Sequence, residues 1–329
     1  MSIDTKSELF YKPEELSLTR ENLACKDKNR IVAVVHDGVM HADDVFAIAL
    51  LMCIYAPYNI KIVRSRSANE AYSADIVLDV GRIYDGKKFF DHHQSEDEDF
   101  NLIAKNGVKH CAFTLLAEKV ISDKEVLEKF QEKVGYPIAV RDNAQIEMFA
   151  GFSSSVGSWV HCMNPTWKDN VTEDVLFKNA CIMARTIILR ELKQIKATIS
   201  ARDVVRETIE KSKDPQVIVF NKYIPYEEVT DEYPDVLFVI FRVPEKDQWI
   251  LQSVPKNSKN KFDSRMLLPK QWRGYDPSAD YFDSKYHDFI KDVGAHCVFV
   301  HKAGFISSWF SKDAAIQAAQ IAVKAANYT

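Results

Sequence analysis

A continuous apolar run, Ile31–Val35, is the feature that most limits what this chain can fold into. A strand without polar alternation is buried on both faces, which is typical of parallel sheets covered by helices. Residues Asp43–Tyr55 follow with apolar side chains at helical spacing, and Pro57 marks the end of that helix. Three further strands are predicted in the same part of the chain: Lys61–Arg66, Ala74–Val80 and Lys88–Phe90. Alternating strands and helices predict an α/β fold with a doubly wound, mainly parallel sheet.

The pattern changes in the second half of the chain. Residues Ala112–Ala150 are mostly helical with an interruption at Gly135–Pro137, and a long helical stretch, Thr172–Lys211, is predicted to be a connecting spine. Four strands separated by turns are predicted next: Gln216–Phe220, Val236–Val243, Trp249–Val254 and His296–His301. A final amphipathic helix, Ser311–Ala326, follows them. We therefore expect an N-terminal arm over residues 1–30, the α/β domain with its connecting helices over 31–212, and a smaller C-terminal α+β domain over 213–329.

Length, charge and cysteine usage narrow the class of protein. The 329 residues suffice for two domains with cores of their own. A formal net charge of −4 argues against a protein that coats nucleic acid, but it allows an enzyme with a local basic groove. The six cysteines are scattered without a C-x-x-C motif, which indicates reduced thiols. We recognise no membrane-spanning run, secretory signal or Arg-rich mitochondrial leader, and so expect an intracellular protein of the cytosol or nucleus.

Histidines and aspartates stand directly after the predicted strands of the first half. They are His36, His41 and Asp43 after the first strand, Asp79 at the end of the third, and Asp91, His92 and His93 after the fourth. Side chains at the carboxyl ends of parallel strands meet at one edge of the sheet, where ligands bind in open α/β folds. Imidazole and carboxylate groups are ligands of divalent metals, so the order predicts a metal site at this edge.

Each of these residues also has an ordinary structural explanation. Asp43 is placed to be a helix N-cap, and Asp79 to be the turn residue that ends a strand. The Asp91-His92-His93 sequence is more specific, because adjacent histidines after an aromatic strand rarely have a structural reason. The aspartate before them can hold a histidine ring in one tautomer. The joint order of the motifs therefore carries more weight than any one residue.

This order, H-x4-H-x-D, a strand aspartate, D-H-H-Q and D-N, resembles the DHH phosphoesterase superfamily and in particular the MYG1 family. That family is also labelled UPF0160 or metal-dependent protein hydrolases. Later segments are similar to the family too: Met163–Trp167, Trp249 with Val254-Pro255, Phe262 with Arg265, Leu268–Gly274 and Val300–Ile306. Two positions depart from it, since Asp44 stands where the family usually has Glu and Ser95 where it commonly has Arg.

The resemblance implies two bound divalent metal ions and a set of residues for them. The implied ligands are His36, His41, Asp43, Asp79, His92 and Asp142. A set of imidazoles and carboxylates without thiolates suits Mn²⁺, with Mg²⁺ or Zn²⁺ as alternatives. His93 is then the catalytic residue that donates to the phosphate or leaving group, and Asp91 orients a histidine. Arg265, His301 and Lys302 are expected to bind the substrate phosphate, although Arg265 and Lys302 are also explained as surface charges.

The function implied by the resemblance is that of a hydrolase. We expect a metal-dependent phosphodiesterase, most simply a 3′→5′ exonuclease on RNA, with DNA as the alternative nucleic acid, which uses water activated by two metals. The enzymatic alternative is a small-molecule phosphohydrolase acting on pyrophosphate, a short oligonucleotide or a cyclic dinucleotide. A third possibility is a partner-binding protein that keeps its metals for stability. The sequence contains no metalloprotease H-E-x-x-H motif, so it does not support the protein-hydrolase label. It also does not indicate an oligomeric state.

Overall fold

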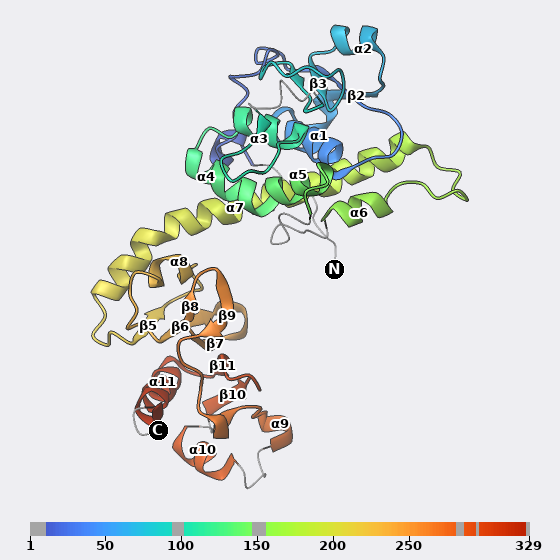
Figure 1. Cartoon of the computed structure of the whole chain (residues 1–329). Coiled ribbons are helices and arrows are strands. Elements are labelled where there is room, and N and C mark those ends of the chain that lie inside the picture. The colour runs from blue at the N-terminus through green and yellow to red at the C-terminus, as the bar shows by residue number, and fades with distance from the viewer. Residues whose placement is uncertain (1–10, 94–101, 147–155, 281–285, 294–295, 327–329) are drawn as a thin grey trace. The chain divides into compact units, whose positions relative to one another are not determined.

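The computed structural model describes residues 11–93, 102–146, 156–280, 286–293 and 296–326 and divides the chain into two compact units. The first unit is Met1–Lys196 and the second is Ala197–Thr329. The predicted spine is a single helix of 38 residues, α7 (Glu173–Glu210), and the boundary between the units falls within it. Figure 1 shows α7 as the longest helix of the chain. No helix of the described residues is both long and apolar enough to cross a bilayer.

The first unit is built on a parallel sheet of four strands in the order β2-β1-β3-β4. The strands are β1 (Ile31–Val35), β2 (Ile60–Arg64), β3 (Ile76–Leu78) and β4 (Phe89–Phe90). Val35 pairs with Leu78, and Leu78 pairs with Phe90. The next residue of each of these three strands therefore leaves the sheet at the same carboxyl edge. The predicted α/β class and the parallel sheet are confirmed, and the register explains why the motifs converge.

Helices make up most of the rest of the first unit. They are α1 (Ala42–Tyr55), α2 (Ala68–Ser73), α3 (Ala112–Val120), α4 (Lys124–Phe130), α5 (Tyr136–Asp142), α6 (Val156–Cys162) and the first part of α7, with short turns of 3₁₀ helix at Pro13–Leu16 and Pro57–Asn59. Helix α1 is buried on every side, as a helix without a polar face must be, and packs against α3, α5 and α6. It therefore forms the centre of this unit.

The sequence did not predict two details of these helices. Helix α2 lies in a stretch that was not assigned to any element. The expected interruption at Gly135–Pro137 is instead a π-helical turn, Gln131–Gly135, that leads directly into α5. Pro137 stands in the first turn of α5, directly after this π-helical turn. Part of the predicted N-terminal arm and of the Ala112–Ala150 stretch lies outside the described residues.

The second unit contains a mixed sheet of five strands in the order β10-β11-β7-β6-β5. Its strands are β5 (Val217–Phe220), β6 (Phe238–Val243), β7 (Gln248–Ser253), β10 (Cys297–Val300) and β11 (Ile306–Trp309), and a separate hairpin is formed by β8 (Pro255–Asn257) and β9 (Asn260–Ser264). Its helices are α8 (Glu227–Thr230), α9 (Pro277–Asp280), α10 (His287–Asp292) and α11 (Lys312–Ala326), with 3₁₀ turns at Pro244–Lys246 and Lys270–Trp272. The α+β prediction is confirmed, whereas β8, β9 and β11 were not predicted.

Candidate metal centre

The carboxyl edge of the parallel sheet and the N-terminus of α1 bring the predicted ligands together. His36 follows β1, Asp79 follows β3, and Asp91 follows β4. His41 is the N-cap of α1, and Asp43 lies in the first turn of that helix. Asp79 has a φ of +52°, a left-handed conformation that short polar side chains tolerate best among non-glycine residues. The turn after β3 thus directs this carboxylate to the centre of the edge.

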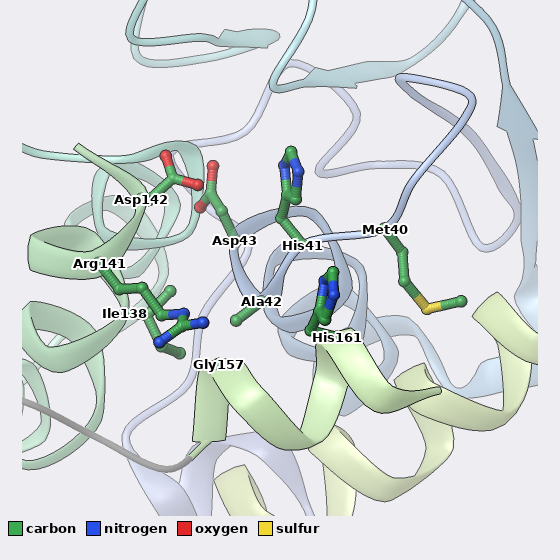
Figure 2. A pocket seen from close by; sticks show the side chains of 9 residues that line it. All are labelled: Met40, His41, Ala42, Asp43, Ile138, Arg141, Asp142, Gly157 and His161. Atoms are coloured by element: carbon green, nitrogen blue, oxygen red, sulfur yellow. The ribbon is translucent and has the colours of Figure 1, made fainter. Parts of the chain in front are cut away.

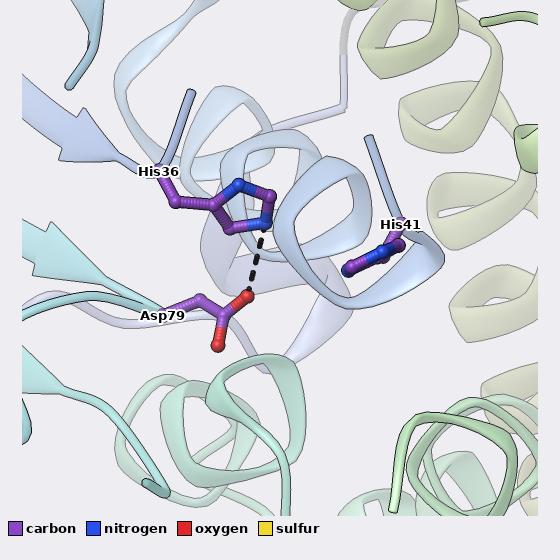
Figure 3. Close-up of side chains that lie close together, drawn as sticks. All are labelled: His36, His41 and Asp79. Atoms are coloured by element: carbon purple, nitrogen blue, oxygen red, sulfur yellow. Dashed lines mark ion pairs between the residues drawn. The ribbon is translucent and has the colours of Figure 1, made fainter. Parts of the chain in front are cut away.

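The His36 ring lies against two buried carboxyl groups, those of Asp44 and Asp79. Its Nδ1–H donates to the Asp37 carbonyl at 2.8 Å, and this tautomer leaves a lone pair on Nε2. Nε2 lies 3.1 Å from Asp44 Oδ2 and 3.3 Å from Asp79 Oδ2, the pair drawn in Figure 3. Among the described residues, His36 Nε2 and Asp44 Oδ2 are buried without a hydrogen-bond partner. Three electron-rich atoms in contact require a cation or an added proton between them, and a divalent ion fits.

The possible ligand atoms form one continuous cluster. Three groups have ligand atoms that all lie within 4.8 Å of one another: His36, His41 and Asp79; Asp79, His92 and His93; and Asp43, His92 and Asp142. Asp79 and His92 each belong to two groups, so the groups are linked. Each of the six predicted ligands occurs in at least one of them. The structure therefore brings the whole predicted set together, which is the arrangement that sites for two neighbouring metals require.

Asp43 caps a helix, but not the one expected from the sequence. Its Oδ1 accepts a hydrogen bond from the Phe113 N–H at 2.7 Å, and its Oδ2 from the Ala112 N–H at 3.0 Å. These are the first N–H groups of α3, whereas the N-cap of its own helix is His41. The two hydrogen bonds fix the orientation of the carboxylate, since it is completely buried. Its remaining lone pairs stay available toward His92 and Asp142.

Burial disfavours the ionised form of the carboxyl groups in the cluster. Burial raises the pKa of Asp44 and Asp79 to about 8 and that of Asp43 and Asp142 to about 7. Repulsion adds to burial, from Asp142 on Asp79 and from Asp43 on Asp142. Carboxyl groups packed in this way hold their protons unless a cation replaces them. The electrostatics therefore agree with the geometry in favouring bound cations.

The two adjacent histidines have different environments. The His92 side chain is 7% exposed and its Nε2 lies 3.3 Å from Asp142 Oδ2, whereas the His93 side chain is 57% exposed. The Nδ1–H of His93 donates to Asp91 Oδ1 at 2.8 Å, and Asp91 Oδ2 accepts from the Arg82 N–H at 2.6 Å. Asp91 therefore orients His93, which identifies the histidine that the sequence had left open. The orientation leaves Nε2 as the free donor or acceptor of the ring.

The charge of this pair follows from the same contacts. The hydrogen bond to Asp91 raises the pKa of His93 to about 9 against the effect of its burial, and Asp79 adds to the rise. Burial alone would raise the pKa of Asp91, but the hydrogen bonds from His93 and Arg82 hold it below its usual range. The raised pKa favours the imidazolium form of the exposed His93 ring, which can donate a proton or a hydrogen bond to an anion.

A pocket of about 200 Å³ opens beside Asp43 and Asp142 (Figure 2). It is lined by Met40, His41, Ala42, Asp43, Ile138, Arg141, Asp142, Gly157 and His161. The loop that carries His41 is fixed by Asn164, whose amide donates to the Met40 carbonyl at 3.0 Å and accepts from the Met40 N–H at 2.8 Å. Asp44, Arg141, His161 and Asn164 were not predicted as site residues. The acidic pair in α1 is the sequence signal for Asp44 and the Met163–Trp167 motif that for Asn164, whereas Arg141 and His161 have none.

The residues predicted to bind phosphate lie in the second unit. The Arg265 guanidinium donates to three backbone carbonyls, those of Thr230, Tyr233 and Val236, at 2.6, 2.7 and 2.9 Å. The His301 ring packs against Phe305, and its Nδ1 accepts from the Ala303 N–H at 3.1 Å. Lys302 is exposed. Contacts within the unit therefore account for Arg265 without a substrate, whereas Lys302 is available to an anion.

Replacing Arg265 with alanine is expected to destabilise the second unit by about 3 kcal/mol, because three carbonyls lose a charged donor. Differential scanning calorimetry of the full chain would measure the shift. Lys302→Ala is the matched control, since this exposed side chain can be removed with little effect on stability. Normal stability of Arg265→Ala together with a raised KM for substrate would instead assign the residue to phosphate binding.

Comparison with known proteins places the chain in a family. A family model described as "Uncharacterised protein family (UPF0160)" matches residues 32–323. The MYG1 protein of Schizosaccharomyces pombe is 26% identical over 329 residues, with 90% of this chain and 98% of that protein covered. The human MYG1 exonuclease is 26% identical over 332 residues, with 89% of this chain and 86% of that protein covered.

A solved structure, the pGpG-specific phosphodiesterase PggH from Vibrio cholerae, aligns with 92% of this chain and 99% of its own. Its identity is 10% and its TM-score 0.27. The family model, by contrast, spans most of the sequence, including every motif from His36 to His301. The chain therefore belongs to the UPF0160 family of MYG1 proteins, as its motifs predicted.

Proposed function

We propose that this protein is a divalent-metal-dependent phosphodiesterase of the DHH type that removes nucleotides from the 3′ end of RNA. The observation that carries the proposal is the linked cluster of imidazole and carboxylate groups around Asp79 and His92. The name of the human and mouse relatives, MYG1 exonuclease, supports nucleic acid as the substrate. An intracellular location is proposed with it, because all six cysteines are free thiols.

The donor set fits hard or borderline divalent metals. His36, His41, Asp43, Asp79, His92 and Asp142 would hold two ions, with Asp79 shared between them. Mn²⁺ is the proposed metal, and Mg²⁺ and Zn²⁺ are the alternatives, because the set contains nitrogen and oxygen donors without sulfur. Bound there, such ions supply Lewis acidity toward the phosphate and a water of lowered pKa. Asp44 would orient His36 through its contact with Nε2 in the metal-free state.

The side chains of the cluster have separate tasks in this proposal. His93, held by Asp91 and exposed, would donate to a phosphate oxygen or to the leaving group. Asp91 is the positioning residue for that ring. In the second unit, Lys302 and His301 would contact phosphates of the bound nucleic acid. Arg265 has a smaller part in phosphate binding than the sequence suggested, because its guanidinium already donates to three carbonyls.

Two observations favour a second candidate, hydrolysis of short substrates. The pocket beside the cluster measures about 200 Å³, below the roughly 300–1,000 Å³ of sites for drug-sized ligands. The net charge of −4 also gives no general attraction for a long polyanion. Pyrophosphate, a dinucleotide or a cyclic dinucleotide would then be the substrate. A partner-binding protein stabilised by metal is the remaining possibility, and it predicts metal-dependent stability without turnover.

One assay separates the candidates. The full chain with Mn²⁺ is incubated with 5′-labelled RNA, with DNA of the same sequence, with a dinucleotide and with pyrophosphate. A ladder that shortens from the 3′ end of RNA supports the exonuclease, and release from the small substrates alone supports the second candidate. Absence of turnover on all four substrates by metal-loaded protein contradicts both, and leaves the metal-stabilised binding protein.

Asn164→Ala is expected to weaken Mn²⁺ binding about tenfold to a hundredfold, because the loop that carries His41 loses both contacts to Met40. Titration calorimetry with MnCl₂ would measure the affinity. Asn179→Ala, at an exposed position of α7, is the matched control and should bind Mn²⁺ like the unmodified protein. Unchanged affinity with a lower melting temperature would mean that Asn164 serves the fold alone.

A further inference from the structure

We propose that Arg141 and His161 form a phosphate-binding subsite in the pocket beside the metal cluster, in the same unit as the metal ligands. This inference rests on the proposed function and adds to it the residues that hold the nucleotide. Both side chains line the pocket together with Asp43 and Asp142. In Figure 2 the Arg141 guanidinium and the His161 ring lie on the α6 side of Ala42, and Asp43, Asp142 and His41 lie on the other side.

Arg141 is cationic and is not committed to another group of the described chain. It stands in the last turn of α5, next to Asp142, and is exposed. Among the described residues, no hydrogen bond or ion pair is formed by its guanidinium, although Asp43 and Asp142 line the same pocket. This contrasts with Arg64, which donates to Gly38 O, and with Arg265 in the second unit. An arginine that lines a pocket and has no partner there can donate all of its guanidinium N–H groups to an oxyanion.

The position of Arg141 is set by packing against Gly157. A Cβ at Gly157 would overlap Arg141 Cδ and would lie 2.7 Å from Nε. The side chain of Arg141 therefore lies directly on the first turn of α6, in a space that only glycine leaves open. Gly157 itself is buried. This contact directs the guanidinium along the pocket wall, and it is independent of the charges in the cluster.

Size and charge identify the ligand as a phosphate group. One side of the pocket holds the carboxylates that would bind metal ions, and the other holds a guanidinium and an imidazole. With metals bound, both sides attract an anion, and the ions together with Arg141 would neutralise charge on opposite sides of the same group. The volume of about 200 Å³ suits a phosphate with part of its sugar more than a whole nucleotide. The chemical class is thus a nucleotide phosphate held beside the metals.

The test measures binding of adenosine 5′-monophosphate and of inorganic phosphate to the Mn²⁺-loaded full chain by titration calorimetry. Arg141→Ala is expected to weaken AMP binding at least tenfold, or about 1.4 kcal/mol, and His161→Gln several-fold. Gly157→Ala keeps all charges but displaces Arg141, and is expected to weaken AMP binding several-fold as well. Arg30→Ala is the matched control, because Arg30 is an exposed arginine of the same unit outside the pocket. Mn²⁺ affinity is measured for every variant.

The results of these titrations either support or overturn the subsite. Weaker AMP binding by Arg141→Ala and Gly157→Ala, with Mn²⁺ binding and Arg30→Ala unchanged, supports the subsite. AMP affinity equal to that of the unmodified protein in both variants overturns it, as does loss of AMP binding that merely follows loss of Mn²⁺. Failure of the unmodified protein to bind AMP or phosphate also overturns it. Failure of the proposed function looks different, since AMP would then bind normally while no nucleic acid or small phosphodiester is hydrolysed.

Discussion

Replacing Asp79 with asparagine is expected to raise the melting temperature of the metal-free protein while it lowers phosphodiesterase activity about a thousandfold. Asp79 takes part in two of the three ligand groups, and no other carboxylate does. Metal ions lower the barrier by several kcal/mol, and each 1.36 kcal/mol is a factor of ten in rate. If Asp79 holds both metals as proposed, its loss should remove most of the rate, which is measured as kcat/KM on the best substrate.

The gain in stability follows from the burial of the same group. Burial raises the pKa of Asp79 to about 8, which means that its ionised form is disfavoured inside the folded unit. An amide of the same shape cannot ionise, so the unfolded chain loses the advantage it gains from ionising Asp79 at neutral pH, and the metal-free protein should be stabilised by about 2 kcal/mol, or a few degrees. Asparagine is chosen over alanine because the residue has a φ of +52°, which asparagine tolerates.

The control for Asp79→Asn is Asp27→Asn, at an exposed position before β1, which should change neither quantity. A variant that loses activity and stability together would show that Asp79 serves the fold. A variant that keeps its activity would remove Asp79 from the metal site. Only the opposed changes, higher stability with lower activity, identify a residue retained for chemistry at a cost in stability.

The sequence predicts those parts of the fold and site that depend on local pattern. Apolar runs such as Ile31–Val35 are buried strands because no polar side chain interrupts them. Residues that follow parallel strands meet at one edge because the strands are in register, as Val35 is with Leu78 and Leu78 with Phe90. The convergence of His36, Asp79 and Asp91 therefore needs only the order of the elements.

Contacts between distant segments could not be predicted in this way. Asn164 and Met40 are 124 residues apart, and neither has a local reason to pair with the other. Asp43 appeared to cap its own helix, yet it caps α3, because the buried position of α1 brings the two helices together. Arg265 appeared free to bind a phosphate, but the carbonyls that it contacts come from a segment about thirty residues earlier. Such pairings depend on packing, which one-dimensional spacing does not record.

The metal-free protein is expected to lose stability as the pH rises from about 4 to about 8. The pKa values of Asp43, Asp44, Asp79 and Asp142 are raised from 3.8 to about 7 or about 8, mainly by burial. Within that window the folded protein holds more protons than the unfolded chain, so the free energy of unfolding falls as the pH increases. The stabilisation is complete below about pH 4 and is lost once the pH exceeds the pKa values of the folded state.

Bound metal should reverse this trend, since the ions replace the protons between the same carboxylates. Melting temperatures would be measured from pH 5.5 to pH 8.5, once with EDTA and once with Mn²⁺. With EDTA we expect the melting temperature to fall toward pH 8.5, and the increase caused by Mn²⁺ to be largest there. Asp79→Asn should flatten the EDTA curve, because one of the raised groups is gone. A stabilisation by Mn²⁺ that is the same at all pH values would mean that the ions bind away from these buried carboxylates.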